Sequence, residues 1–266
     1  MTKLSISTTL WMASLRSELQ YRANFLIMVV MGIVYQCTGF AFIWVVLGRF
    51  HALAGWSLGE VAFLYGLRLT MHSFNGALTG GLYGLEWKVR QGEFDRYLVR
   101  PMPPLLQLIC ERIHVSIAGD LLGGLVLFIT AASLVTVAWT PLALLYLTLA
   151  VIGGALVELA LRVLFSALAF RFLSANAFMY VLDTVFSNFT NYPLKIFGSV
   201  LEFLFTFGLP LAFMAYFPAV VLLGRTGELQ VNPIFAYGAP LAGIVWLIVA
   251  LAAFHNEMRN YQSAGH

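Results

Sequence analysis

Long apolar runs separated by short polar breaks follow one another along most of this chain. A helix needs about 20 mostly apolar residues to cross the core of a bilayer. Six runs are candidate spans, at residues 24–47, 60–83, 113–138, 141–170, 177–191 and 233–254. No small-residue cleavage site follows the first run, which we interpret as a permanent span rather than a signal peptide. The pattern predicts an all-α polytopic membrane protein, with residues 1–266 forming one transmembrane domain.

The segment before the first span, residues 1–23, has the pattern of an amphipathic helix. Its apolar side chains recur at helical spacing, at Leu4, Trp11, Met12, Leu15 and Leu19. We expect this helix to lie in the cytoplasmic interface with Trp11 at the depth of the lipid headgroups. It serves either as a membrane anchor or as a contact surface for a cytoplasmic partner, and the two roles are compatible.

Residues 192–224 are apolar but are interrupted by Pro193, Pro210 and Pro218. These breaks predict a re-entrant helical hairpin, entered from the outside between the fifth and sixth spans. Such a hairpin must be covered by protein, because lipid cannot satisfy interrupted backbone. The alternative is a seventh complete span, which would place the C-terminus outside.

Composition and charge support this interpretation and orient the chain. Hydrophobic residues make up 61% and charged residues 10% of the sequence, whereas an ordinary soluble domain carries about 25% charged residues. With a cytoplasmic N-terminus, ten of the 15 basic residues are inside: Lys3, Arg16, Arg22, Lys88, Arg90, Arg96, Arg100, Arg112, Arg171 and Arg259. Only Arg49, Lys195 and Arg225 are then outside. Short cytoplasmic loops are enriched in basic residues. We therefore expect a multi-pass protein of a bacterial plasma membrane with both termini in the cytoplasm.

The two cysteines carry no metal-binding spacing, and we expect no disulfide between them. Cys37 lies in an apolar run, and Cys110 lies in the segment predicted to be cytoplasmic, where thiols stay reduced.

Most of the cytoplasmic charge is concentrated in residues 84–112, between the second and third spans. Two short helices are predicted there, joined at Gly92 and ended by Pro101. Exposed aromatic residues among charges are typical of a docking surface, and the alternative is an elbow with its aromatics dipped into lipid. The residues assigned to this surface are Glu86, Trp87, Arg90, Gly92, Glu93, Phe94, Asp95, Tyr97, Leu98, Arg100 and Pro101.

At this point the sequence resembles a known family. The run Gly92-x-Phe94-Asp95-x-x-Leu98-x-Arg100-Pro101 is similar to the signature of bacterial type 2 ABC-transporter permeases, in particular a small six-span branch. A second, weaker similarity is the outer run Gly208-Leu-Pro-Leu-Ala212, which follows Tyr192-Pro193 and precedes Tyr216-Phe-Pro218. The resemblance covers nearly the whole chain. It implies that 84–112 contains a coupling helix seated in a groove of a separate ATPase, and that two permease subunits pair around a substrate path.

The chain has no ATP-binding motif of the P-loop type. That motif needs G-x-x-x-x-G-K-[ST], and none of the three lysines, Lys3, Lys88 and Lys195, follows a glycine. We therefore expect no cofactor in this chain, and ATP and magnesium bound by two partner ATPase subunits. Force would enter near Gly92 and pass into the second and third spans.

Several ionisable residues interrupt the predicted spans, where they normally face protein or water. Arg68, His72 and Asn75 share one face of the second span, either lining a substrate path or subunit interface, or satisfying groups within the bundle. Glu158 and Arg162 are spaced to form an i,i+4 pair, which Asp183 in the fifth span can join. Asp120, near the cytoplasmic third of the third span, either bonds to the backbone or faces the cytoplasm, and no side-chain partner is predicted for it.

Small residues in the spans permit close helix approach. The glycines concerned are Gly76, Gly80, Gly81, Gly123, Gly124, Gly153 and Gly154, and packing within one subunit is favoured over a dimer seam.

The outer part of the chain is rich in phenylalanine, at Phe186, Phe189, Phe203, Phe205, Phe207 and Phe213. Lipid-facing packing is the simpler interpretation, and a hydrophobic outer gate is the functional one. The residues assigned to the gate and re-entrant segment are Tyr192, Pro193, Pro210, Phe213 and Pro218.

The function expected from these features is that of the permease subunit of an ATP-driven exporter for a hydrophobic or amphipathic substrate. A related rather than identical second permease is favoured, membrane lipids are the other partners, and no nucleic acid is expected. The alternatives are an intramembrane enzyme, for which no catalytic motif is present, and a non-transporting scaffold or immunity protein.

Overall fold

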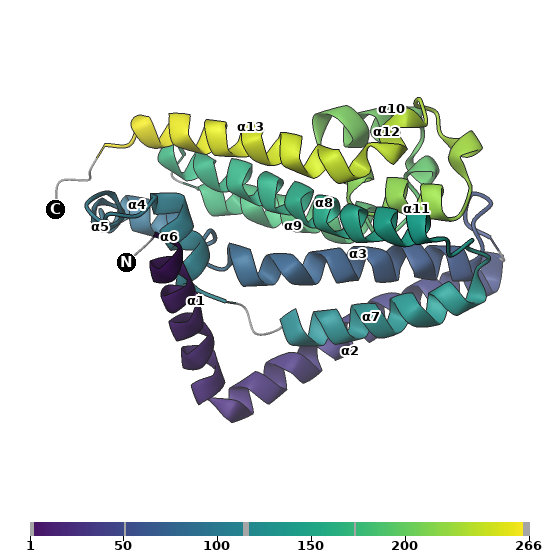
Figure 1. The fold of residues 1–266 in the computed structure, drawn as a ribbon, viewed down its shortest axis with the longest axis horizontal. Coiled ribbons are helices and arrows are strands. Elements are labelled where there is room, and N and C mark those ends of the chain that lie inside the picture. The colour runs from purple at the N-terminus through teal and green to yellow at the C-terminus, as the bar shows by residue number, and fades with distance from the viewer. Residues whose placement is uncertain (1–2, 51, 114–116, 173, 263–266) are drawn as a thin grey trace.

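The computed structural model describes residues 3–50, 52–113, 117–172 and 174–262. Within these ranges the regular secondary structure is helical, and one isolated bridge joins Leu53 and Trp56. The long helices run lengthwise through one bundle, and successive members run in opposite directions (Figure 1). They are α2 (Arg22–Phe50), α3 (Leu58–Thr79), α7 (Ile117–Leu134), α8 (Pro141–Ser166, extended by η1, Ala167–Phe170), α9 (Ala175–Phe189) and α13 (Ala239–Arg259). Each overlaps one of the six apolar runs.

Three of these helices are long and apolar enough by themselves to cross a membrane: the segments Arg22–Ala41, Pro141–Phe170 and Ala239–Arg259. The other three, α3, α7 and α9, run beside them through the same bundle (Figure 1). Helix α3 carries Arg68 and His72, α9 is short, and only residues 118–134 of α7 count as an apolar helix. These helices therefore differ from the first three in polarity or in length.

Local sequence signals place the helix starts. The Ser57 side chain accepts the Glu60 backbone N–H, and the Glu60 carboxylate accepts the Ser57 N–H, so that a complete capping box begins α3. Thr140 caps α8 through the Ala143 N–H, and Pro141 occupies the first turn, where its missing donor costs nothing.

Helices α3 and α7 pack closely because Gly124 faces α3. A β-carbon on Gly124 would lie 2.9 Å from Leu69 Cβ and 3.0 Å from the Thr70 backbone nitrogen. The neighbouring Gly123 is different, since its β-carbon would meet only Gln36, at 3.8 Å. The expectation of tight packing within one subunit is confirmed for Gly124.

Both ends of the described chain lie at one end of the bundle, together with the polar segment between α3 and α7 (Figure 1). That segment folds into α4 (Leu85–Arg90), α5 (Asp95–Leu98) and α6 (Pro104–Glu111). Helix α1 (Lys3–Gln20) lies across the bundle axis at the same end (Figure 1). The Trp11 indole N–H donates to the Ala77 carbonyl at 3.4 Å, so the side chain has a partner inside the protein.

The opposite end of the bundle holds the proline-broken segment (Figure 1). It is divided into η2 (Leu194–Phe197), α10 (Ser199–Phe203), the π-helix η3 (Leu204–Gly208), η4 (Leu211–Phe213) and α11 (Tyr216–Leu222), and is followed by η5 (Thr226–Glu228) and α12 (Ile234–Tyr237). Because the segment stays at this end before α13 begins (Figure 1), it does not form a seventh span.

Much of this segment is core rather than lipid-facing surface. Phe186 is 1% exposed, Phe205 4% and Phe213 8%, whereas Phe203 is 62% exposed. The lipid-facing interpretation is therefore wrong for the first three. The interrupted backbone of η4 and α11 is covered by protein, as membrane-depth irregular structure requires, with Ala212, Phe217 and Val220 fully buried.

The adjacent glycines of α7 provide a matched test of the α3–α7 contact. We expect Gly124→Ala to lower the free energy of unfolding by about 1–3 kcal/mol, because an added methyl overpacks the contact. Gly123→Ala, which has room for its methyl, leaves stability unchanged or slightly raised. The measurement is the thermal melting of each purified variant, and equal melting temperatures for the two variants would contradict the packing argument.

Candidate functional site

Arg162 of α8 is the centre of a buried ion-pair network. Its guanidinium donates to Glu158 Oε1 from Nη2 at 2.9 Å and from Nε at 3.2 Å. From Nη1 it also reaches Asp183 Oδ1 of α9 at 2.7 Å. The side chain of Arg162 is 5% exposed and that of Glu158 is 0% exposed. The i,i+4 pair and its extension to Asp183, both expected from the spacing, are confirmed.

Tyr83 connects this network to the segment that begins α4. Its hydroxyl lies 2.9 Å and 2.8 Å from the two oxygens of the Asp183 carboxylate and also contacts Arg162. The Arg162 guanidinium stacks over the Phe186 ring at 5.2 Å and over the Tyr83 ring at 5.6 Å. The positive charge is therefore enclosed by two carboxylates and two aromatic faces.

One face of α3 is directed at α8 and α9. His72 Nδ1 lies 2.7 Å from Glu158 Oε1, the Arg68 Nε–H donates to the Thr190 hydroxyl at 3.1 Å, and the Asn75 amide donates to the Ala155 carbonyl at 3.1 Å. The three side chains thus lie on one face, as expected. They satisfy groups within the bundle, and only His72 has a carboxylate as its partner.

Asp120 of α7 receives a partner that the sequence did not indicate. The Gln36 amide of α2 donates to Asp120 Oδ1 at 2.7 Å, and the Tyr65 hydroxyl of α3 donates to Gln36 Oε1 at 3.0 Å. This chain of hydrogen bonds joins α2, α3 and α7.

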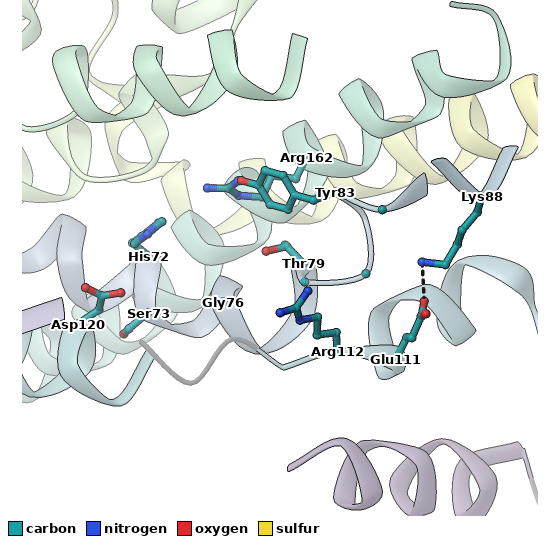
Figure 2. Close-up of a pocket in the computed structure, with 13 residues that line it drawn as sticks. His72, Ser73, Gly76, Thr79, Tyr83, Lys88, Glu111, Arg112, Asp120 and Arg162 are labelled. Atoms are coloured by element: carbon teal, nitrogen blue, oxygen red, sulfur yellow. Dashed lines mark hydrogen bonds and ion pairs between the residues drawn. The ribbon is translucent and has the colours of Figure 1, made fainter. Parts of the chain in front are cut away.

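His72, Asp120 and Arg162 all line one cavity of about 620 Å³ (Figure 2). Its remaining lining comes from the end of α3, the turn before α4 and the end of α6: Ser73, Gly76, Thr79, Gly80, Gly81, Tyr83, Gly84, Lys88, Glu111 and Arg112. Polar side chains thus surround a space inside an otherwise apolar bundle.

Helices α4 and α5 form a folded unit around Phe94. Gly92 has a φ of +70°, which turns the chain so that the Phe94 N–H donates back to the Lys88 carbonyl at 3.1 Å. Phe94 is 0% exposed and packs on Tyr97, Phe170 and Tyr261. The expected exposure of Phe94 is therefore wrong, because the short helices need their own core.

Tyr97 is also buried, at 9% exposure, contrary to expectation. Its hydroxyl donates to Glu111 Oε2 of α6 at 2.9 Å. Burial raises the pKa of Tyr97 above its ordinary value, and the hydrogen bond to Glu111 acts in the same direction. The tyrosine stays protonated and holds α5 against α6.

Glu86 is buried rather than exposed, and it links α4 to α9. Glu86 Oε2 accepts the Asn176 backbone N–H, in the first turn of α9, at 2.6 Å. The helix dipole favours a carboxylate at this position.

The rest of the assigned docking surface remains accessible. Trp87 is 60% exposed, Leu98 46% and the neighbouring Val99 84%. Glu93, Arg90, Arg96, Arg100 and Pro101 are exposed, and Asp95 is half-buried. We refer to these exposed apolar side chains of α4, α5 and the following residue Val99 as the apolar patch; exposed arginines are their neighbours in the sequence.

The residues assigned to the outer gate lie in the proline-broken segment. Pro193, Pro210, Phe213 and Pro218 are buried and Tyr192 is half-buried. Phe213 stacks edge-on against Phe217, with ring centroids 5.0 Å apart. These side chains pack within the chain.

Sequence reasoning missed Gln36, Tyr83 and Arg112 as site residues. Gln36 lies in an apolar run, where a lone amide is a signal for a buried partner. Tyr83 and Arg112 lie at the edges of expected spans, and only the fold brings them to the cavity.

Cys37 and Cys110 are both free thiols, as expected. Within the described part of the chain, no group of three or more His, Cys, Asp or Glu residues could hold a metal ion.

Comparison with known protein families identifies one match. The model of the family described as ABC-2 family transporter protein matches residues 33–265. No curated protein and no solved structure matches.

The buried network can be tested at Arg162. We expect Arg162→Met to lower the free energy of unfolding by about 3–5 kcal/mol, because it leaves two carboxylates without their cation. Arg90→Met removes the same charge from a half-exposed pair with Glu86 and should change stability by about 1 kcal/mol or less. Thermal melting measures both, and a similar melting temperature for the two variants would show that the network does not hold the bundle.

A second prediction separates the core of the α4–α5 unit from its surface. Phe94→Ala should lower the free energy of unfolding by about 3–5 kcal/mol, because it empties a fully buried aromatic site. Trp87→Ala, at an exposed position, should leave the melting temperature nearly unchanged. A stable Phe94→Ala variant would contradict the assignment of Phe94 to the core.

Proposed function

This chain belongs to the ABC-2 transporter family, and from that premise we propose that it is the membrane-spanning subunit of an ATP-driven exporter of hydrophobic or amphipathic substrates. As a family member it is an integral membrane transport subunit that works with ABC ATPase partners. The proposal adds the direction of transport and the substrate class. A mostly apolar groove of about 360 Å³, lined largely by residues of α2 and α7, supports the substrate class.

The observation that carries the proposal is the exposed apolar patch on α4 and α5. Trp87, Leu98 and Val99 are solvent-exposed at the end of the bundle that also holds both ends of the described chain. Tryptophan and arginine dominate the energetics of protein interfaces, and both types are exposed on α4 and α5. We assign the patch to the ATPase contact.

Two contacts suit α4 for passing movement into the bundle. Tyr83, before α4, contacts Asp183 and Arg162, and Glu86, within α4, accepts the N–H of Asn176. A displacement of α4 by the ATPase would therefore pull on α8 and α9. Coupling in this form is rigid-body movement of packed helices.

The orientation follows from the same end of the molecule. The patch and both ends of the described chain share one side of the bundle (Figure 1), and this side carries most of the basic residues. We propose that it faces the cytoplasm, and that the protein resides in a bacterial plasma membrane.

The working complex contains two permease and two ATPase subunits in this proposal. The ATPases bind ATP and magnesium. The second permease in this proposal is a related chain rather than an identical one, and purification of the complex tests this.

Trp87 tests the docking assignment. We expect Trp87→Ala to weaken the ATPase–permease complex by about 2 kcal/mol or more, as for a central interface tryptophan. Trp139→Ala is the matched control, because Trp139 is 40% exposed and lies between α7 and α8, at the opposite end of the bundle. The measurement is the amount of ATPase that co-purifies with each tagged permease.

Two outcomes of this experiment would contradict the proposal. Equal ATPase recovery with both variants would place the contact elsewhere on the permease. Failure of any nucleotide-binding subunit to co-purify with the unaltered chain would remove the transport proposal itself.

A further inference from the structure

Among the described residues, Arg112 is the one cation of the polar cavity whose side chain has no hydrogen-bond or ion-pair partner. Arg112 is exposed and points into the cavity toward Thr79 (Figure 2). Among the described residues, none makes a hydrogen bond or ion pair with Arg112. An arginine that lines a cavity in this way provides a fork of N–H donors for a carboxylate or a phosphate.

The other charged groups of the cavity already have partners. Lys88 pairs with Glu111 at 3.1 Å, Arg162 pairs with Glu158 and Asp183, and His72 contacts Glu158. These groups define polar walls without competing for Arg112.

Asp120, the other acid of the cavity, lies away from Arg112 in Figure 2. It accepts the Gln36 amide, which offsets part of its charge. Of the cavity's cations in the described part of the chain, Arg112 is therefore the one left unpaired, and its charge favours an anionic group.

An apolar groove lies on the other side of the Gln36–Asp120 hydrogen bond from this cavity. Gln36 lines the groove, and Asp120 lines the cavity. The groove has a volume of about 360 Å³ between α2 and α7. Its lining is almost entirely apolar: Ile33, Cys37, Phe40, Leu69, Leu122, Gly123, Val126, Leu127 and Thr130, with Gln36 at its polar end.

We propose that the cavity and the groove together form a binding site for a single-chain anionic amphiphile, with its phosphate or carboxylate headgroup at Arg112 and its alkyl tail between α2 and α7. Ligand sites of this size are commonly mostly apolar with a few polar groups that orient the ligand. Headgroup and tail are matched here by two spaces of opposite polarity, on the two sides of the Gln36–Asp120 hydrogen bond. The role of this site as the point of substrate entry rests on the proposed transport function, whereas the binding itself does not.

The probe is dodecyl phosphate with a photoreactive diazirine at the end of its tail. It is titrated onto the full chain in phosphatidylcholine nanodiscs, without ATP or ATPase, and crosslinking is measured after illumination. We expect Arg112→Gln to raise the half-saturating concentration about tenfold, because a charge-assisted hydrogen bond is lost. Arg22→Gln is the control, since Arg22 is exposed on α2 and lines neither space.

A second variant tests the tail. Gly123 lines the groove, and a β-carbon added there meets only Gln36, at 3.8 Å, so we expect the branches of Gly123→Leu to enter the groove. We expect this variant to reduce crosslinking to α2 and α7, and the unaltered chain to be crosslinked on the groove-lining segments 33–40 and 122–130. Crosslinks elsewhere, or an unchanged yield with Gly123→Leu, would overturn the tail assignment.

Competition identifies the ligand chemistry. Unlabelled dodecyl phosphate should displace the probe at far lower concentration than inorganic phosphate. If inorganic phosphate competes equally well, the site takes a free anion and not an amphiphile. If dodecyltrimethylammonium competes better, Asp120 rather than Arg112 determines binding, and the proposal is wrong. Neither outcome depends on ATPase co-purification, so failure here is distinct from failure of the transport proposal.

Discussion

A guanidinium inside an apolar bundle must be neutralised, and the arrangement of this protein depends on how Arg162 meets that requirement. Removing a charge from water costs several kcal/mol even after relaxation. Glu158 supplies a partner from the same helix, and Asp183 supplies one from α9. Since His72 of α3 shares the Glu158 carboxylate, the need to pair one cation fixes three helices relative to one another.

The same requirement connects the interior to the end of the bundle. Tyr83 is drawn to Asp183 and Arg162 from the turn just before α4. Helix α4 is also tied to α9 through Glu86. The segment with the exposed Trp87 is therefore attached to the most constrained part of the core, and a partner bound there acts on a rigid element. Tyr83 and Lys88 of this attachment also line the polar cavity. The proposed site for a charged headgroup would therefore neighbour the helix on which the ATPase is proposed to act.

Periodicity and charge spacing in the sequence predicted a good part of this arrangement. The apolar runs marked the long helices, because a bilayer demands continuous apolar length. Helical geometry alone indicated that Glu158 and Arg162 could pair and that Arg68, His72 and Asn75 share a face. The prolines indicated that residues 192–224 do not cross the bundle as one helix, and Figure 1 shows that they remain at one end.

Exposure was the point on which sequence reasoning failed. Phe94 and Tyr97 stand among charges and were expected at the surface, yet they are buried. Two helices of six and four residues cannot hold their shape without a core, and Phe94 provides it by packing on Phe170 and Tyr261 from distant parts of the chain. Those contacts cannot be inferred from local pattern, because the residues are far apart in sequence.

By itself, the sequence determined the helical class and the membrane environment, and it located the charged segment that we propose as the docking site, since each follows from apolar length and local charge. Only the tertiary structure decided which polar groups meet. Gln36 and Asp120 are separated by 84 positions, and Arg112 and His72 come from different helices and turns. The physical reason is that a cavity and a groove are properties of packed helices: the polar cavity and the apolar groove exist only once α2, α3, α7 and α8 have come together.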